Sequence, residues 1–498
     1  MSKMIEKLQP FLTVNAYEKA SEYDEDSFDI IEVETDETIG SYSLNEKGEL
    51  VGFSLWDEPP EGNHSKDQMA AIAQNFVDTF YPEQKEFELS GILDLDNPYM
   101  ITYEKRDEKY GIFLHSTGFT VSVSTSGQIT SFYCADEDYE VRYSDIVVSE
   151  EKALETYIEG LDFEVIIQKF NSEVYKNGDN QYHLSYSVIE QVMDIPVDGS
   201  DTTSIHEGYA LESAIQKQET PTQNVYELIG LTAEYKLLDK QVEEGRRIEI
   251  WSTNDNVDEY TFEKDETDDH VIKLCFDEKT NMLLEVLSGE EYENHGEEEI
   301  GLESAKGRAL EVMFKFFSDT HERYRLEVPE DEIDDFDDEM EEFDEEDFTE
   351  EEFIDEEFDE DDIDEDEWVD KYIEHEDVYT FYFHLHHKGI RVDQHVTLIS
   401  VGKYTGKITH VNLDVPDQNL YLKLPTTPTI STNEAKGIYK KYVKMELMFT
   451  REYDEDGKSI YTLAYVPDFP DTIGSVRAID AVTGKAMYVD VGDATFIK

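Results

Sequence analysis

Residues 42–55 read YSLNEKGELVGFSL, and a closely similar pattern returns at residues 121–134 as VSVSTSGQITSFYC. In both stretches apolar and polar residues alternate on either side of a polar turn, which ends in Gly48 in the first and in Gly127 in the second. Alternation of this kind is typical of a strand with one buried face, and glycine adopts the positive φ that a tight hairpin requires. Each stretch therefore predicts an antiparallel hairpin that packs one face against a core.

The hairpin pattern recurs three more times, with turns at Asn281, Gly406 and Gly484. Gly48 and Gly127 are 79 residues apart, and Gly406 and Gly484 are 78 residues apart. Asparagine tolerates positive φ better than most residues, so Asn281 suits the same kind of turn. A regular period of this length is typical of a chain built from tandem copies of one small unit.

Helical patterns recur with the same period. Stretches that begin after Ser65, Ser149 and Ser431, and another near Leu302, place Ala and large apolar residues on one helical face. The sequence therefore predicts an α+β fold of tandem units, each a helix packed on an antiparallel sheet. The expected boundaries are 1–60 for a partial N-terminal unit, 61–145 for a unit, 146–225 for a degenerate unit, 226–300 for a unit, 301–328 with 370–424 for a unit, 329–369 for an acidic low-complexity insertion, and 425–498 for the C-terminal unit.

The composition of the chain limits its partners. Its 498 residues carry a formal net charge of −79, which repels nucleic acid and anionic lipid and favours a basic protein or peptide. The N-terminal sequence has no apolar core of signal-peptide length, and no stretch reaches the length of a membrane span. We therefore expect a cytoplasmic protein with no membrane insertion and no nucleic-acid partner.

The most acidic segment is residues 330–367, which contain 28 Asp or Glu and no Lys, Arg or His. Large apolar residues recur there at a spacing of five, which fits neither a helical nor a strand face, so the segment is predicted to be disordered. It is also a candidate partner-binding segment, because acidic residues keep hydrophobic anchors solvated. Weak divalent-cation binding is a further possibility, since carboxylates suit Ca²⁺ and Mg²⁺. The candidate anchors are Phe343, Phe348, Phe353, Phe358 and Trp368.

The motifs resemble a known family. A helix in STNEAKGIYKKYV, at residues 431–443, precedes the hairpin AIDAVTGKAMYVD at residues 478–490, and residues 379–413 form a long hairpin pattern. Together they are similar to the YcdB/YcdC repeated domain of Firmicutes, which is itself similar to the PepSY domain. The resemblance covers most of residues 60–498 and implies a helix-on-sheet fold, a binding or inhibitory role and no catalytic residues. Many relatives look exported, whereas we expect no signal peptide in this chain.

Common catalytic motifs are missing from the sequence, and no cofactor is expected. One histidine group remains. His384 and His386 share a face of a predicted strand, His395 lies on the next strand, and His387 should point the other way. Three converging imidazoles would suit Zn²⁺, whereas the alternative is a partly exposed sheet face on which histidines fill amphipathic positions.

These observations favour a non-catalytic protein- or peptide-binding protein with a regulatory role, which modulates a peptidase or an envelope-related partner. The free faces and edges of antiparallel sheets are common docking surfaces for peptides. The alternative is a metal-dependent hydrolase that uses His384, His386 and His395 as its site.

Overall fold

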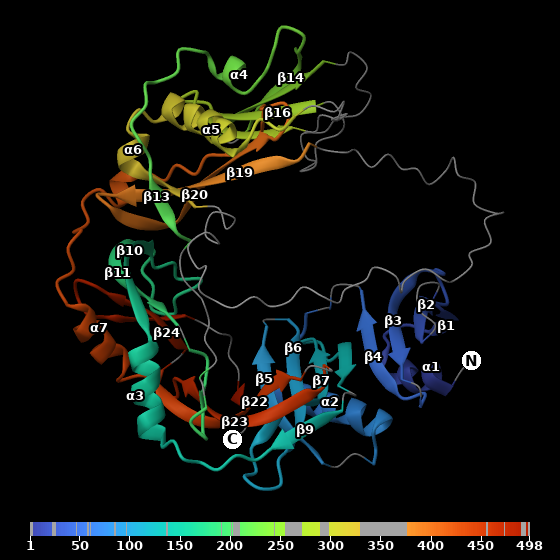
Figure 1. Ribbon diagram of the computed structural model, residues 1–498. Coiled ribbons are helices and arrows are strands. Elements are labelled where there is room, and N and C mark those ends of the chain that lie inside the picture. The colour runs from blue at the N-terminus through green and yellow to red at the C-terminus, as the bar shows by residue number, and fades with distance from the viewer. Residues whose placement is uncertain are drawn as a thin grey trace.

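The computed structural model shows a mixed fold with few helices and large antiparallel sheets, arranged as three bodies along an arc (Figure 1). We name these bodies the N-terminal sheet (residues 16–134), the inserted sheet (residues 236–412) and the central body, which lies between them and contains the helices α3 (Glu150–Gly160) and α7 (Thr432–Tyr439). The residues that the structure describes are 3–21, 26–45, 47–56, 59, 61–83, 86–95, 97–135, 138–190, 192–200, 202, 210–243, 245–253, 271–288, 298–328, 376–454, 457–472, 474–489 and 495–496.

The N-terminal sheet consists of two four-stranded meanders that pair through their last strands, β4 and β8, in antiparallel fashion. Phe53 lies opposite Phe132 in this pairing, and each follows its own hairpin turn by five residues. The two meanders are thus related by an approximate two-fold axis. The elements are α1 (Lys3–Leu8), η1 (Gln9–Phe11), β1 (Ala16–Ala20), β2 (Ser27–Glu32), β3 (Thr38–Leu44), β4 (Leu50–Leu55), α2 (Lys66–Phe80), β5 (Phe87–Asp94), β6 (Tyr99–Arg106), β7 (Phe113–Val123), β8 (Ile129–Cys134) and, on the outer edge of β5, β26 (Thr495–Phe496).

The inserted sheet repeats this arrangement. Its two meanders pair through β17 and β21, and Val286 lies opposite Val411, again five residues after each turn. The elements are β13 (Glu212–Ala214), which adds to the outer edge of β18, α4 (Val225–Leu228), β14 (Lys236–Glu243), β15 (Arg246–Ser252), β16 (Val271–Asp277), β17 (Leu283–Ser288), α5 (Leu302–Phe316), α6 (Thr320–Arg323), β18 (Tyr324–Glu327), β19 (Val378–His387), β20 (Ile390–Gly402) and β21 (Ile408–Asn412).

The central body is built from two segments that lie far apart in the sequence, on either side of the inserted sheet. The first segment contributes a helix and two long strands, and the second contributes a helix and four strands. The elements are β9 (Tyr139–Arg142), α3 (Glu150–Gly160), β10 (Asp162–Lys169), β11 (Tyr182–Ile189), β12 (Ile195–Pro196), η4 (Gln418–Leu420), α7 (Thr432–Tyr439), β22 (Lys444–Tyr453), β23 (Ser459–Asp468), β24 (Ser475–Asp480) and β25 (Ala486–Val489).

The two segments of the central body exchange strands reciprocally. β24 pairs with β11, and the short β12 pairs with β23. The flanking hydrogen bonds match as well: the amides of Val147 and Val148 donate to the carbonyl of Val197, and those of Thr429 and Ile430 donate to the carbonyl of Ala481. Each segment therefore completes the sheet of the other.

Two tyrosines mark the approximate two-fold axis of the central body. Tyr157 on α3 and Tyr439 on α7 lie 282 positions apart, both are fully buried, and their hydroxyls are 3.1 Å from one another. The helices that carry them begin alike, since Ser149 and Ser431 each cap the first turn through their hydroxyl oxygen. α3 and α7 are thus equivalent elements of two interlocked halves.

The five positions expected in hairpin turns all have positive φ and lie between paired antiparallel strands. In Gly127 this conformation is also crowded, because an added Cβ would lie 3.0 Å from the Cδ1 atom of Ile72. Glycine is therefore required there by both backbone and space. The φ angles are 73° at Gly48, 89° at Gly127, 58° at Asn281, 64° at Gly406 and 74° at Gly484.

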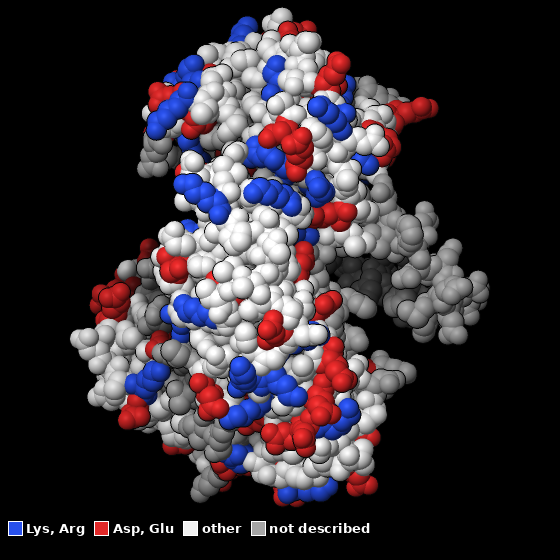
Figure 2. Space-filling model, turned by 90° about the vertical axis from the view of Figure 1, so that its left-hand side faces the viewer, with Lys and Arg blue, Asp and Glu red and all other residues white. Residues whose placement is uncertain are grey.

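The apolar core follows the three bodies. One buried cluster fills the N-terminal sheet beneath α2, and a larger continuous cluster joins the central body to the inserted sheet. Among the described residues, no helix combines the length and apolarity that a bilayer crossing requires. Most of the excess acidic charge lies outside the described residues, and Figure 2 shows Lys and Arg interspersed with Asp and Glu on one face.

Candidate functional site at two equivalent junctions

The central body meets each large sheet at a junction. At one junction, β20 of the inserted sheet pairs in parallel with β10 through Val392 and Ile167. At the other, β7 of the N-terminal sheet lies against β22 and β23, and the Tyr461 hydroxyl donates a hydrogen bond to the carbonyl of His115. β10 and β22 are equivalent strands, since each begins thirteen residues after the serine that caps its helix.

The same irregularity in strand pairing forms both junctions. In the N-terminal sheet, Tyr103 of β6 pairs with Phe119 of β7, and the next pair is Lys105 with Leu114, so β7 has more residues than β6 between the two pairs. In the inserted sheet, His384 of β19 pairs with Val396 of β20, and the next pair is His386 with Arg391, so β20 has the extra residues there. The surplus residues of β7 and β20 leave their own sheet and reach the central body. This large bulge redirects side chains, as bulges commonly do near functional sites.

Two backbone features confirm that the junctions correspond. Gly111 and Gly389 both have positive φ, 69° and 86°; Gly111 lies two residues before Phe113, which pairs with Arg106, and Gly389 lies two residues before Arg391, which pairs with His386. Ser116 and Gln394, inside the bulges, both have a φ of 64°. Positive φ is uncommon for residues other than glycine, so the coincidence identifies one backbone geometry used twice.

At the junction with the inserted sheet, which we name the filled junction, β13 places Glu212 among basic side chains. Its Oε1 atom lies 2.7 Å from Nη2 of Arg391, and its Oε2 atom lies 2.7 Å from Nε2 of His386. Nε2 of His384 lies 2.7 Å from Oε2 of Glu327, which is the residue opposite Glu212 in the β13–β18 pair. The filled junction is thus a largely buried network of carboxylates, histidines and one arginine.

Burial and neighbouring charges shift the pKa values of the carboxyl groups in this network in opposite directions. Burial raises the pKa of the Glu164 carboxyl on β10, and the charge of Glu212 raises it further, although Arg391 opposes both effects. Burial also raises the pKa of Asp393. Burial alone would raise the pKa of Glu212, but the hydrogen bond and charge of His386, together with Arg391, lower it overall. Glu212 is therefore held as the ionised partner.

At the junction with the N-terminal sheet, which we name the open junction, the described residues surround a cavity of about 630 Å³. Its lining is largely apolar, with a few charged groups, which is the usual character of a ligand pocket. The lining residues are Ser90, Arg106, Gly111, Ile112, Phe113, His115, Glu446, Leu447, Met448, Pro467 and Asp468.

Several positions of the open junction correspond to positions of the filled one. Phe113 pairs with Arg106 as Arg391 pairs with His386. Glu446 is the third residue of β22, as Glu164 is the third residue of β10. The cavity therefore lies where the filled junction holds the carboxylate of Glu212.

Two basic side chains of the open junction, His115 and Arg106, are paired with carboxylates within the protein. His115 Nδ1 lies 3.0 Å from Oε2 of Glu104, and the amide of Ser116 donates to Oε1 of the same carboxylate. This hydrogen bond raises the pKa of His115; burial would raise the pKa of Glu104, but His115 and Ser116 lower it overall. Arg106 Nε lies 3.0 Å from Oε2 of Glu88, and its guanidinium lies 3.6 Å from the centre of the Phe113 ring.

The three histidines expected in the alternative reading do not form one site, so that expectation is wrong. His384 and His386 contact carboxylates of the filled junction, whereas His395 contacts other groups: its Nδ1 lies 2.6 Å from Oδ2 of Asp414 and its Nε2 lies 2.6 Å from the hydroxyl of Tyr182. The cause is the bulge in β20, which breaks the simple alternation assumed for this hairpin. Among the described residues, no group of three or more His, Cys, Asp or Glu is placed to hold a metal ion.

His387 was expected to point away from its neighbours, and it is buried against Tyr421, with ring centres 5.7 Å apart. Burial lowers the pKa of His387. This histidine therefore belongs to the core rather than to an exposed face.

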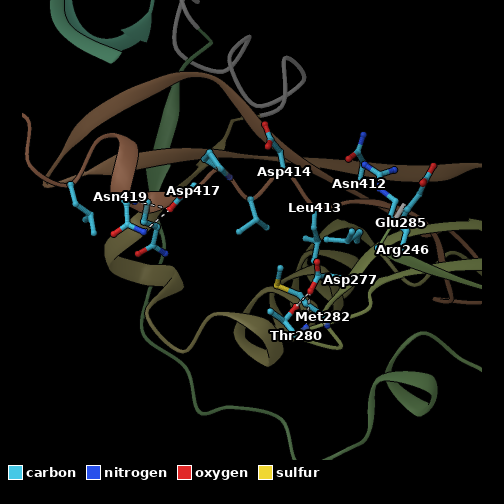
Figure 3. Close-up of a pocket in the computed structure, with 16 residues that line it drawn as sticks. Arg246, Asp277, Thr280, Met282, Glu285, Asn412, Leu413, Asp414, Asp417 and Asn419 are labelled. Carbon is cyan, nitrogen blue, oxygen red and sulfur yellow. Dashed lines mark hydrogen bonds between the residues drawn. The ribbon is translucent and has the colours of Figure 1, made fainter. Parts of the chain in front are cut away.

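A second cavity, of about 800 Å³, lies beside the last strands of the inserted sheet (Figure 3). Its carboxylates do not converge on one point, as Figure 3 shows. Asp277 accepts hydrogen bonds from Thr280, and Asp417 accepts one from the amide of Asn419. Figure 3 shows Asp414 apart from both pairs. The cavity has polar walls without a focused binding arrangement.

The groups that organise the junctions could not be recognised in the sequence. Glu212, Glu104 and Arg391 are isolated among many charged residues, and their partners lie on other strands. A sequence signal that could have found them is the pair of glycines at positions 111 and 389, each in the connection between two long strands. The candidate anchors Phe343, Phe348, Phe353, Phe358 and Trp368 lie outside the described residues.

Comparison with known families gives a match on the N-terminal sheet. Residues 12–136 match the family model of the YcdB, YcdC repeated domain. This match spans β1 to β8 and confirms the resemblance expected from the sequence, and it begins before residue 60, where that resemblance was expected to start.

Individual proteins also resemble the chain. It is 25% identical over 475 residues to the protein YcdB of Bacillus subtilis strain 168. The matched region covers 89% of this chain and 87% of YcdB. Among solved structures, the C-terminal domain of YpeB from Bacillus megaterium is 12% identical and covers 42% of this chain and 99% of that one, with a TM-score of 0.26. A TM-score of this size is too low to establish a shared fold.

Proposed function

We propose that this chain is a non-catalytic regulatory protein that binds extended peptide segments of a partner by adding them to its sheets. One observation supports this most directly. The outer edges of β5 and β18, the first strands of two corresponding meanders, each carry a short antiparallel strand from a remote part of the chain, β26 and β13. Strand addition of this kind supplies main-chain hydrogen bonds with any sequence, while side-chain pockets supply specificity.

The proposal includes two finer expectations. We propose that each helix with its meander is a PepSY-like unit, which the matching pairing of the two large sheets supports. We also propose that the partner is basic and that it is a peptidase or an envelope-related protein. The net charge of −79 supports a basic partner, because it would speed the association of a positively charged protein and repel anionic competitors.

A peptide library tests the function. The purified full chain is presented with a display library of random extended peptides at low and at high salt, and bound peptides are sequenced. We expect enrichment of related peptides, with basic flanking residues selected at low salt, because screening weakens contacts between exposed charges. No enrichment at either salt concentration would overturn the proposal.

A further inference from the structure

We propose that the outer edge of β14 pairs with the same strand of a second copy of this chain, so that two molecules form a symmetric dimer. This inference concerns self-association and does not depend on the proposed peptide-binding function. β14 is the terminal strand of the inserted sheet, and Figure 1 shows it on the side of that sheet away from the central body. Within the part of the chain that the structure describes, no strand pairs with its outer edge.

The outer edges of the two large sheets are covered to different extents. β13 covers the edge of β18, and β26 covers part of the edge of β5. β1, the first strand of the N-terminal sheet, has only five residues, and α1 packs beside it. β14 has eight residues, and most of their side chains are exposed. Among the described strands of the two sheets, β14 therefore offers the longest uncovered edge, and such an edge is a template for pairing with another chain.

A bulge gives β14 a centre of symmetry. Its pairing with β15 skips Leu238, which lies as a bulged residue between Leu237 and Asp239. Seven positions of β14 remain in the ladder, and Lys240 is the central one. Two identical antiparallel strands are related by a two-fold axis, so their positions can be matched outward from this centre. In that register only the bulged residue of each copy is left without a partner, as in an ordinary bulged pair.

The side chains that this register brings together are complementary. Leu237 lies opposite Val242 of the second copy, and these exposed apolar side chains, 43% and 50% accessible, would cover one another. Lys236 lies opposite Glu243, which carries the opposite charge. The two-fold axis supplies each of these pairs twice. The strand is therefore complementary to itself in both apolar surface and charge.

The central position brings Lys240 opposite Lys240 of the second copy. Nζ of Lys240 lies 3.1 Å from Oε1 of Glu249, a buried carboxylate on β15. The same oxygen lies 2.9 Å from Nε of Arg247. Each lysine at the axis therefore has a carboxylate of its own sheet beside it, which reduces the repulsion between the two lysines.

The edge of β14 is electrically balanced, although the chain as a whole is strongly acidic. Lys236 and Lys240 offset Asp239 and Glu243 along the strand. At an ionic strength of about 0.15 M the screening length is about 8 Å, so exposed charges farther than this from β14 oppose the contact only weakly. One strand pair buries much less surface than an obligate dimer interface, and we therefore expect a reversible dimer.

A charge exchange tests the contact. Sedimentation velocity over a series of protein concentrations, at about 0.15 M salt, measures dimerisation of the full chain, of Lys236→Glu, of Glu243→Lys and of the double variant. Each single change places like charges opposite one another twice, whereas the double change restores opposite charges in reversed order. Lys19→Glu makes the same change of net charge on β1 and is the matched control. Thermal melting checks that every variant folds.

We expect the wild-type chain to dimerise reversibly as its concentration rises. Lys236→Glu should weaken the dimer about tenfold, equivalent to about 1.4 kcal/mol. The double variant should regain most of the lost affinity, and the control Lys19→Glu should change it less than about twofold. A wild-type chain that stays monomeric at every concentration, or a double variant no tighter than the single ones, would overturn the proposal.

A cysteine at the centre of β14 tests the register. Residues directly opposite one another in an antiparallel pair have Cα atoms about 4.5 to 5.5 Å apart, a distance that a disulfide can span. Lys240→Cys should therefore give a disulfide-linked dimer on mild oxidation, and Lys19→Cys should not. Cys134 and Cys275 are present in both variants, so any link that they form appears in the control as well. A dimer that Lys240→Cys does not link would contradict the register.

The display library distinguishes a second copy from another partner at this edge. If the chain stays monomeric but Lys236→Glu abolishes the enrichment of library peptides, β14 binds a partner and the dimer proposal is wrong. If the chain dimerises and no library peptide is enriched, the dimer stands and the proposed peptide-binding function fails.

Discussion

The filled and open junctions show how similar backbone arrangements can enclose either a buried network of charged and polar side chains or a cavity. Both are made by the same bulge against equivalent strands of the central body. In the filled junction Arg391, His386 and Glu212 form a buried ionic network, whereas in the open junction Phe113 replaces the arginine and a cavity remains among the described residues. The comparison shows that a change of a few side chains accompanies the change from a buried network to a cavity.

The largest effect is expected from Arg391→Met. The change removes a cation from the buried carboxylate of Glu212, and breaking such a pair costs about 3 kcal/mol of unfolding free energy. The equivalent change at the open junction, Phe113→Met, should cost no more than about 1 kcal/mol, because it replaces one apolar side chain by another. Urea unfolding of both variants measures the difference. Equal losses would show that the two junctions do not differ in the way described.

A smaller loss is expected from Glu104→Gln, which weakens the only charge pair that His115 makes by its Nδ1 atom in the described structure. Hydrogen bonds to charged groups contribute about 2 kcal/mol, so the variant should lose about that amount near pH 6. The mutant keeps nearly the same volume, which limits other effects.

The pH dependence of this loss has a definite sign. Because the folded pKa of Glu104 is lowered, its contribution is present above its ordinary value of 4.5 and is lost as the pH falls through the folded pKa. Because the folded pKa of His115 is raised, its contribution is present below 6.5 and is lost as the pH rises through the folded pKa. The difference in melting temperature between wild type and Glu104→Gln should therefore be largest between these values. A difference that does not vary with pH would contradict the pairing.

The smallest effect concerns the axis that makes the two junctions equivalent. Tyr157→Phe should cost about 1 kcal/mol of unfolding free energy, because it removes hydrogen bonds to Tyr439 and Glu190 in a buried site. Tyr439→Phe should cost less, and the double variant should lose less than the sum of the two, since both changes remove the same shared bond. Denaturation of the three variants provides the measurement, and strictly additive losses would argue against a contact between the tyrosines.

The sequence predicted local features of this fold well. Helices α2 and α7 begin after serines that cap their first turns. The turns at Gly48, Gly127 and Asn281 have the positive φ that these residues predicted. Such features depend on a few adjacent residues, so a short stretch contains most of the information that determines them.

The features that join distant segments could not be predicted in this way. β12 has two residues and β13 has three, too few for any periodic pattern, yet each completes a sheet that lies elsewhere. The three-histidine hypothesis failed because alternation holds only while strand pairing is regular, and β20 loses its regular pairing between Val396 and Arg391. The cavity escaped notice for the same reason, since its walls come from five different strands and their connecting turns.

The reciprocal exchange in the central body has a consequence for synthesis. The N-terminal sheet can assemble its helices and meanders from nearly contiguous residues, but β11 must wait for β24, which is translated almost 300 residues later. Until then its hydrogen-bonding edge and the partly built core beneath α3 are exposed, and such surfaces promote aggregation of nascent chains. A chain that ends within the inserted sheet would therefore lack β24 and would leave this edge of β11 without its partner strand.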